Sequence, residues 1–417
     1  MKRWVACAAL LLGVTPASAE TLAIINVRAW TMTERQPVEQ ATVVISDGRI
    51  VSVLAHGPVP AGAKTIDGAG KTVTPSLIDA ATQIGLGEIG GVPEEQSATV
   101  SKGPLGAAFD LSYAVDENAI TIQQARADGL ARALLYPDGS AGAPFDGVGA
   151  ILRLTAEGSR VERPRAAMFA SVGADKVAGM GGSRAAGWQL LRNALDEARD
   201  YQRLRRQPGT RDQLLNHLDA EALAPLLANN VPLVIATDKL ADIKQAIAIA
   251  RDEKIRVIIF GGAEGWAAAT ELAAARIPVI LDPFEDLPFS YDKIGARREN
   301  AAMLGKAGVQ IAFSVSAQGI HRSWNAAPAI REGAGYAVAA GLPYADALAA
   351  ITSAPARIMS LEPQAGTLGP GTSADLVMWD GDPLEASTAP ALVLLGGREV
   401  SPVTRRTLLR DRYDPRR

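Results

Sequence analysis

The chain has 417 residues, is 48% hydrophobic and 21% charged, and carries a formal net charge of −3. This composition is typical of a folded protein with a large core and a smaller second unit, and it excludes a fibre or a disordered chain. No basic stripe is visible along the sequence, so nucleic acid is not expected as a partner. The Arg-rich residues 404–417 predict a solvated tail, with an anchor on an anionic surface as the alternative.

The first 19 residues have the pattern of a secretory signal peptide. Lys2-Arg3 supplies the positive start, Trp4–Val14 the short apolar stretch, and Ala17-Ser18-Ala19 the small-residue cleavage site. The apolar stretch is too short to span a membrane. We therefore expect cleavage after Ala19 and a periplasmic or secreted protein without a membrane span. The only cysteine, Cys7, would be removed, which leaves no thiol, disulfide or thiolate metal ligand.

Short apolar and β-branched runs lie near both ends of the chain. Asp47-Gly48 separates two of them and predicts the turn of a hairpin. Because the two ends resemble each other and flank a different middle, we predict one composite β-sandwich domain from residues 20–72 and 362–403. The runs are Thr21–Val27, Ala41–Ser46, Ile50–Leu54, Asp375–Trp379, Ala391–Leu394 and Glu399–Val400.

Between these ends, strand-like runs alternate with helical patterns. This rhythm predicts βα units and an α/β fold with a parallel sheet, and its length favours a (β/α)8 TIM-like barrel over residues 73–361. The predicted strands are Leu77–Ile84, Leu130–Tyr136, Arg165–Val172, Val231–Ala236, Ile255–Phe260, Ile277–Leu281 and Val309–Ser314. The predicted helices are Glu117–Asp128, Gly187–Arg206, Ala241–Asp252, Trp266–Arg276 and Arg297–Ala307.

Several sequence runs resemble the amidohydrolase superfamily. Pro75-Ser76-Leu77-Ile78-Asp79-Ala80-Ala81-Thr82-Gln83 is similar to its P-G-L-I-D-x-H-x-H run, and Gly261–Trp266 resembles the G-G-H-E-A-W run of the imidazolonepropionase-like branch. Near the end, Gly366–Gly371, Ala374–Val377 and Asp380–Pro383 resemble the family's G-S-L-x-P-G, A-D-L-V and D-G-D-P runs. The matches extend from about Ile24 to Val400. The resemblance implies a metal-dependent hydrolase of C–N bonds other than peptide bonds.

The side chains that should hold the metal ion are replaced. Two histidines separated by one residue leave a strand end on the same side and can reach one ion, but these two positions hold Ala81 and Gln83. The resemblance places the further histidines at Ala236 and Ala263, and a strand-eight aspartate within Phe313–Ser316, where only the serines Ser314 and Ser316 are polar. The strand-four Lys or Glu should lie in Met168–Val172, which contains neither. Asp79 is expected to be structural, and no catalytic, cofactor-binding or metal-binding residue is assigned.

Three histidines remain as alternatives. His56 lies in the N-terminal β unit, and His217 is expected on the surface. His321 follows the last barrel strand and is either an ordinary loop histidine or an acid/base group near neutral pH. Carboxylates that follow predicted strands could bind a divalent ion instead, although acidic residues are common in loops. They are Glu88, Asp238, Glu264, Asp282, Glu285, Asp286 and Asp292.

Two functional hypotheses follow. The first is a degenerate member of the superfamily, a pseudoenzyme with no bound metal that acts as a binding protein or as a non-catalytic subunit. Its expected partners are a small-molecule ligand in the barrel mouth and another subunit, either a second copy or an active homologue. The alternative is an active hydrolase of cyclic amides or related C–N bonds, whose Zn or other divalent metal is held by His321 and loop carboxylates.

Overall fold

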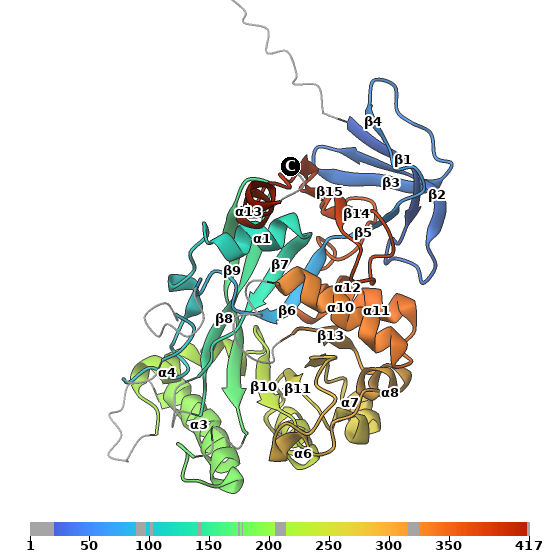
Figure 1. Cartoon of the computed structure of the whole chain (residues 1–417). Helices are drawn as coiled ribbons and strands as arrows, with labels where there is room; N and C mark the ends of the chain where they lie inside the picture. Colours follow the sequence, from blue (N-terminus) through green and yellow to red (C-terminus); the bar gives the residue numbers. More distant parts are fainter. Residues whose placement is uncertain are drawn as a thin grey trace, which may run out of the picture.

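The computed structural model describes residues 21–88, 97–100, 103–139, 144–173, 176, 178–204, 214–315 and 325–414. The predicted signal peptide, Ser316 and His321 lie outside these residues. The described chain forms two eight-stranded sheets, one at an end of the molecule and one surrounded by most of the helices (Figure 1). None of the described helices has the length and apolar character needed to cross a membrane.

The first sheet is built from both ends of the chain, as predicted. Its order is β16-β15-β14-β5-β1-β2-β3, with β4 also paired to β1. The C-terminal β14 pairs antiparallel with the N-terminal β5, so the blue and red strands of Figure 1 lie side by side. The strands are β1 (Thr21–Ala29), β2 (Val38–Ser46), β3 (Arg49–Ala55), β4 (Lys64–Asp67), β5 (Thr72–Pro75), β14 (Leu376–Trp379), β15 (Pro390–Leu395) and β16 (Arg398–Glu399).

This sheet branches at β1 instead of forming the separate facing sheets of a sandwich. Leu22–Ile25 pair with β4, whereas Arg28-Ala29 pair with β5 on the same side of the strand. Asn26 lies between them with φ at 56°, at a register shift against β2. A residue in this left-handed conformation bends a strand as a β-bulge does, so one edge can serve two partners. The predicted turn at Asp47-Gly48 is confirmed, with φ values of 51° and 72°.

The second sheet curls into a nearly closed barrel in the order β13-β12-β11-β10-β9-β8-β7-β6. Its edges meet where the hydroxyl of Ser314, after β13, donates a hydrogen bond to the carbonyl oxygen of Ala81 in β6. Every predicted strand of the middle region overlaps an observed one. The strands are β6 (Leu77–Thr82), β7 (Leu130–Leu135), β8 (Gly147–Leu154), β9 (Ser159–Ser171), β10 (Leu233–Thr237), β11 (Val257–Gly261), β12 (Val279–Leu281) and β13 (Ile311–Phe313).

The barrel departs from a strict (β/α)8 pattern at one strand. The sequence did not predict β8, which pairs antiparallel with both β7 and β9. Residues 155–158 join β8 to β9 directly, without an intervening helix. A hairpin therefore takes the place of one βα unit. Its β9 half is long because residues before Arg165 extend the ladder, although their polar sequence lacks the apolar signal of a buried strand.

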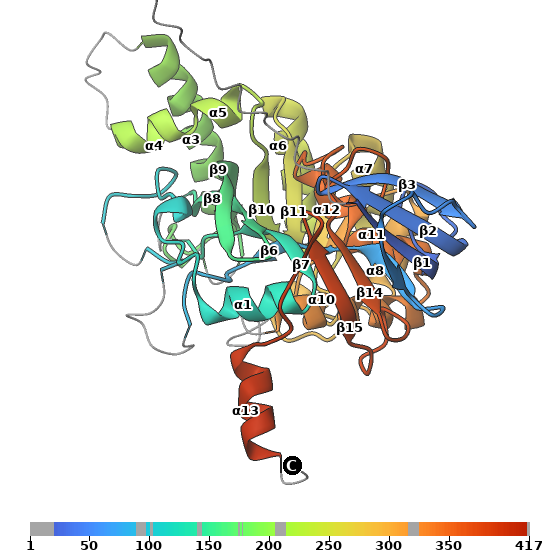
Figure 2. The same ribbon diagram turned by 90° about the horizontal axis from the view of Figure 1, so that it is seen from above.

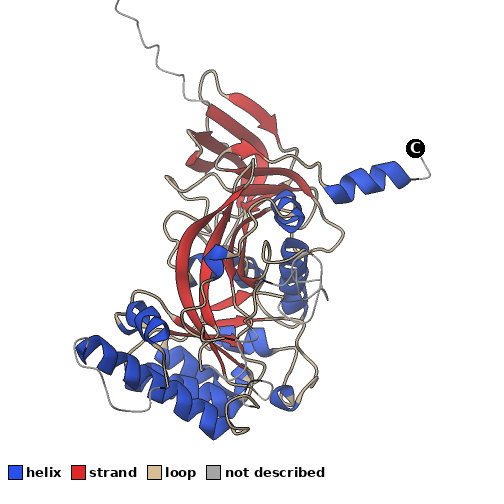
Figure 3. Cartoon of the chain, turned by 90° about the vertical axis from the view of Figure 1, so that its left-hand side faces the viewer, coloured by secondary structure: helices blue, strands red, loops and turns tan. Residues whose placement is uncertain are grey.

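Helices pack along the bottom and one side of the barrel in the view of Figure 3, whereas the strands that face the viewer carry no helix. Alternate strand residues face two separate cores, because side chains in a strand point to opposite faces. Leu233 and Ile259 pack outward with helix residues, whereas Val234 and Ile258 fill the lumen. The α-helices are α1 (Ile120–Ala127), α3 (Arg184–Leu204), α4 (His217–Ala222), α5 (Ala224–Leu227), α6 (Leu240–Glu253), α7 (Ala269–Ala275), α8 (Asn300–Lys306), α10 (Ala326–Ala339), α11 (Tyr344–Ala350), α12 (Ser353–Ile358) and α13 (Arg405–Tyr413). The 3-10 turns are η2 (Leu111–Tyr113), η3 (Gly265–Ala268) and η4 (Tyr291–Lys293).

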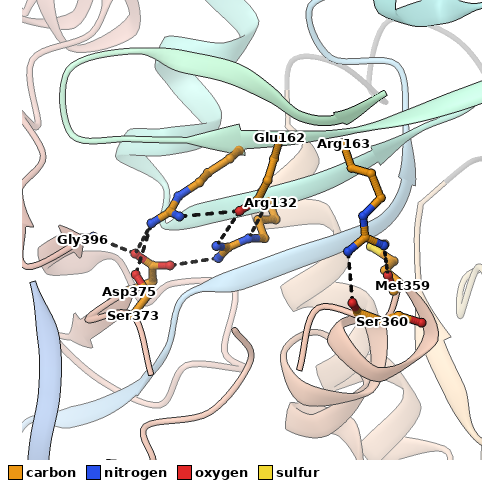
Figure 4. Close-up of polar contacts among 9 residues, drawn as sticks. Arg132, Glu162, Arg163, Met359, Ser360, Ser373, Asp375 and Gly396 are labelled. Carbon is orange, nitrogen blue, oxygen red and sulfur yellow. Dashed lines mark hydrogen bonds and ion pairs between the residues drawn. The ribbon is translucent and has the colours of Figure 1, made fainter. Parts of the chain in front are cut away.

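A buried ion-pair network joins the two sheets (Figure 4). Arg132 of β7 is 1% exposed, and its Nε and Nη1 lie 2.7 Å from Glu162 and 2.9 Å from Asp375. Asp375 precedes β14 and also accepts a hydrogen bond from the backbone N–H of Gly396, at 2.6 Å. The aspartate of the Ala374–Val377 run therefore has a structural role, because it connects the terminal sheet to the barrel.

The predicted solvated tail contains the helix α13. Thr404 and Thr407 cap its start reciprocally, which satisfies backbone N–H groups that the first turn leaves free. Arg406 pairs with Asp128 next to α1, at 2.8 Å. No residue of α13 is buried, and Figure 2 shows the helix projecting from the body. Residues 405–413 are therefore solvated, as predicted, but helical.

Candidate active site at the barrel mouth

The carboxyl ends of the parallel strands meet at one end of the barrel, which we call the barrel mouth. In barrels of this type this end carries the functional groups. It is formed by the strand-terminal residues Thr82, Ser171, Thr237, Gly261, Leu281 and Phe313 and by the residues that follow them. β8 begins at this end because it runs antiparallel to its neighbours, which brings Asp146 to the mouth.

The structure brings the predicted metal-ligand positions to this mouth. Ala81 and Ala236 are the penultimate residues of β6 and β10, and Ala263 follows the end of β11. Ala81 and Ala263 are buried, with 1% and 3% of their surface exposed. A methyl group has no lone pair to give a metal ion, whereas zinc takes sulfur, imidazole nitrogen or carboxylate oxygen.

Polar groups beside these alanines are engaged in other contacts. The amide Nε2 of Gln83 donates to the carbonyl oxygen of Tyr136, at 3.5 Å. Ser314 is fully buried, and its hydroxyl bonds to β6. The residues at the predicted ligand positions therefore do not fit a divalent metal ion. Ser316 and His321 lie outside the described residues.

Three aromatic rings fill the inside of the barrel near its mouth, and nothing in the sequence indicated that they belong to the site. The ring of Tyr136 lies 6.5 Å from that of Phe169 and 5.2 Å from that of Phe260, in an edge-on arrangement with Phe260. Phe260 is also the β11 partner of Ala236. Edge-on and tilted rings at these distances attract each other beyond their burial. They give an apolar wall beside positions where the resemblance implies polar ligands.

Asp79, which is expected to be structural, bonds to residues at the ends of β6 and β13. Its carboxyl group accepts a hydrogen bond from the backbone N–H of Ala81, at 3.1 Å, and also forms a side-chain hydrogen bond with Ser314. Burial raises the pKa of Asp79 to about 8, and the charge of Asp282 adds to this rise. The side chain is therefore protonated at neutral pH, and it holds the end of β6 against β13.

A lysine pairs with the carboxylates that follow β10 and β12. Lys293 Nζ lies 3.5 Å from Asp238 and also donates a hydrogen bond to Glu285. Asp238 accepts the backbone N–H of Ala263, at 3.1 Å. Burial raises the pKa of Asp238 to about 6, against the opposing effect of Lys293. An ammonium group thus balances negative charge beside two of the expected ligand positions.

Lys176 pairs in the same way with a carboxylate beside β9. Its Nζ lies 3.7 Å from Asp146 and 3.0 Å from the carbonyl oxygen of Gly139. Ser171 donates its hydroxyl proton to Asp146. Burial raises the pKa of Asp146, and the charge of Lys176 opposes that rise. The sequence alone could not pair Lys176 with Asp146, because the two residues lie on different loops.

The remaining loop carboxylates take part in local contacts. Arg184 bonds to both Asp242 and Asp292, and Tyr336 donates to Asp286. The other three accept backbone N–H groups: Glu88 from Ile120, Glu264 from Leu240 and Gly295, and Asp282 from Phe284. Within the described part of the chain, no group of three or more His, Cys, Asp or Glu side chains is arranged to hold a metal ion.

Comparison with known proteins identifies the fold. The sequence model of the family described as "Amidohydrolase family" matches residues 264–404. A 57-residue segment is 44% identical to amidohydrolase tasK of Hapsidospora irregularis, and the match spans 14% of this chain and 6% of that protein.

Solved structures match over nearly the whole chain. An amidohydrolase from Thermotoga maritima MSB8 has a TM-score of 0.79 at 22% identity and covers 91% of this chain and 99% of its own. A prolidase complexed with N-methylphosphonate-L-proline has a TM-score of 0.54 at 18% identity, with coverage of 91% and 99%. A zinc-bound adenosine deaminase from Xanthomonas campestris has 0.53 at 16%, with coverage of 95% and 97%. The fold is therefore the one found in these hydrolases.

Proposed function

We propose that this chain is a degenerate hydrolase scaffold, one that binds a ligand or another subunit without a metal centre. The family match and the shared fold support the amidohydrolase superfamily and a scaffold for hydrolysis. The Gly261–Trp266 run supports a finer placement in the imidazolonepropionase-like branch. We extend the superfamily's substrate class, C–N bonds other than peptide bonds, to the ligand that the barrel mouth would bind.

One observation carries the proposal: alanines occupy the positions where the superfamily needs lone pairs. Metal-assisted hydrolysis requires an ion that lowers the pKa of a bound water and polarises the carbonyl. Ala81, Ala236 and Ala263 supply no donor atom to such an ion. Restoring a site would need several simultaneous changes, because these residues belong to three different strands or strand ends.

The charged groups at the barrel mouth also support a site without a metal ion. A metal ion would normally neutralise the carboxylates around it, but here Lys293 pairs with Asp238 and Glu285, and Lys176 pairs with Asp146. Within the described part of the mouth, these two ammonium groups supply positive charge beside the carboxylates.

The test is the metal content and activity of protein purified without chelator. We expect metal far below one ion per chain, and no amidase, lactamase or dipeptidase turnover above a no-enzyme control. Thermal stability should be unchanged by added chelator, because no folding energy comes from metal binding. Near-stoichiometric Zn, Mn or Fe together with turnover would contradict the proposal and favour a site that includes His321 and loop carboxylates.

We also propose that the protein is exported to the periplasm or beyond the cell. The support is the order of charge, apolar stretch and cleavage site in residues 1–19. N-terminal sequencing of protein recovered from the periplasm or the medium should begin at Glu20. Intact chain retained in the cytoplasm, beginning at Met1 or Lys2, would contradict export.

A further inference from the structure

A pocket opens at the amino end of the barrel, opposite the barrel mouth, and we call it the basal pocket. It holds about 390 Å³ of space, part of which is open to solvent. Pockets for small molecules in proteins have volumes of roughly 300–1,000 Å³. The apolar side chains of its wall belong to the cluster that fills the lumen, so they form one continuous surface. They are Leu134, Ile151, Ala166, Ala167, Ile258 and Ile358.

The basal pocket is separate from the barrel mouth. Asn230 and Arg256, which line it, lie just before β10 and β11, where these parallel strands begin. Along β9, Ala167 lines the pocket, whereas Phe169 lies nearer to the mouth and is 3% exposed. The ring of Phe169 lies 6.5 Å from that of Tyr136. The buried Phe169 therefore lies between the basal pocket and the mouth.

Arg163 of β9 lines the basal pocket, and its guanidinium group is held in place. Its Nη1 donates a hydrogen bond to the carbonyl oxygen of Met359, at 2.8 Å, and its Nη2 donates one to that of Ser360, at 3.0 Å (Figure 4). Both acceptors follow α12 and also line the pocket. Since arginine has more N–H donors than these two bonds use, the guanidinium group retains donors for a ligand.

Arg256 lines the same pocket from the loop before β11. Its Nη2 donates hydrogen bonds to the carbonyl oxygens of Asn229 and Asn230, at 3.3 Å and 3.1 Å. Its own carbonyl oxygen accepts the backbone N–H of Leu233, at 2.8 Å, which fixes its backbone at the start of the sheet. A second guanidinium group is therefore oriented before a ligand arrives, and such preorganisation favours binding.

The two guanidinium groups carry positive charge that the chain does not balance nearby. Within the described residues, neither Arg163 nor Arg256 forms an ion pair, whereas Arg132 of β7 forms two. The described residues that line the pocket include no aspartate or glutamate. A pocket lined by charge of one sign concentrates ions of the opposite sign. The basal pocket is therefore suited to an anionic ligand.

The charge and the apolar wall together select the class of ligand. The planar guanidinium group matches a carboxylate, which it can bind through two parallel hydrogen bonds. The apolar wall adds binding free energy only when it covers an apolar group of the ligand. We infer that the basal pocket binds a small carboxylic acid as its anion, with the carboxylate against Arg163 and Arg256 and an aliphatic tail against the apolar wall. This inference goes beyond the proposed function and does not depend on the metal content of the mouth.

Titration with isocaproate, followed by NMR of protein with isotope-labelled methionine methyl groups, tests the inference. Met359 lines the pocket and is 6% exposed, and Met378 of β14 is equally buried but lies in the terminal sheet. The Met359 signal, identified by its loss in Met359→Leu, should shift and saturate at millimolar isocaproate, while the Met378 signal stays in place. The absence of a saturable shift at Met359, or an equal shift at Met378, would overturn the inference.

A pair of arginine variants tests the role of the positive charge. Arg256→Met should weaken isocaproate binding by about 10-fold or more, because hydrogen bonds to charged groups are the strong ones. The matched control is Arg276→Met, which removes an exposed arginine that precedes β12 at the same end of the barrel but does not line the pocket. It should bind isocaproate as the wild type does. Unchanged affinity in Arg256→Met, or an equal loss in both variants, would contradict the assignment.

Two further ligands test the chemical class on the wild-type chain, so they decide the matter even where a variant fails to fold. Isocaproamide has the same tail without the charge, and inorganic phosphate has charge without the tail. Each should bind about 10-fold more weakly than isocaproate, or weaker still. An amide that binds as tightly as the acid would refute recognition by the arginines. Phosphate that binds as tightly would show an anion site that makes no use of the apolar wall, and it would overturn the assignment to carboxylic acids.

Discussion

Replacing Arg132 by methionine should uncouple the terminal sheet from the barrel. The guanidinium is 1% exposed and contacts two carboxylates from different parts of the chain, Glu162 at 2.7 Å and Asp375 at 2.9 Å. Methionine keeps much of the apolar volume but leaves both carboxylates without their main cation. Asp375 is the more severely affected, because only 8% of its side chain is exposed.

The size of the stability loss follows from the burial of the ion pairs that Arg132 forms. Removing one member of a buried ion pair typically costs about 3–5 kcal/mol, since an uncompensated charge remains inside the protein. Arg153 offers a matched control on the same network. Its side chain is 21% exposed and lies farther from the carboxylates, 3.5 Å from Glu162 and 4.0 Å from Asp375. We expect Arg153→Met to cost about 1 kcal/mol or less.

Urea unfolding, followed by circular dichroism, measures both variants against wild type. The urea concentration at the unfolding midpoint should fall much further for Arg132→Met than for Arg153→Met. The slope of the unfolding free energy against urea concentration should stay unchanged. In the double variant Arg132→Met/Asp375→Asn, part of the lost stability should return because one buried charge has been removed. Equal losses from the two arginines, or no recovery in the double variant, would refute this account of the network.

Three further predictions concern single residues. Burial raises the pKa of Asp79 to about 8, against 3.8 for an ordinary aspartate, so the folded state keeps a proton that the unfolded state releases between these values. Stability should therefore fall with rising pH across this window, by up to about 1.4 kcal/mol per pH unit, and Asp79→Asn should reduce the slope that urea unfolding measures between pH 5 and pH 7, whereas an unchanged slope would contradict a buried proton at Asp79. Lys293→Met should cost about 2–3 kcal/mol at pH 8 and less at pH 5, because burial raises the pKa of Asp238 to about 6 and this carboxyl group takes up a proton below that value; a loss independent of pH would argue against the pairing. Thr404→Ala should cost α13 about 1 kcal/mol and speed hydrogen exchange of the amides in residues 405–413, whereas unchanged exchange would show that the cap is unimportant.

Much of the fold could be predicted from local sequence signals. The Asp47-Gly48 turn and the apolar strands recur where the patterns indicated, because turn chemistry and burial act within a few residues. The β8–β9 hairpin was not predicted. Its pairing depends on which distant strand lies beside it, and the polar residues that begin β9 carry no signal of that neighbour.

The candidate site could be predicted only as a set of positions. Strand ends and the family resemblance together place Ala81, Ala236 and Ala263 at one end of the barrel. The lysine–carboxylate pairs at the mouth could not be predicted, because Lys293 and Asp238 are 55 residues apart and meet only through the fold. The aromatic cluster around Tyr136 was hidden for a similar reason: which face of each strand points into the lumen depends on the closed sheet.

Titration of zinc into wild type and a four-histidine variant tests the central claim most directly. The variant carries Ala81→His, Gln83→His, Ala236→His and Ala263→His, which restores imidazoles at the predicted ligand positions. The account predicts that calorimetry detects no zinc binding by the wild type and one ion bound per variant chain. Stoichiometric binding by the wild type, abolished by chelator and accompanied by hydrolysis, would contradict it.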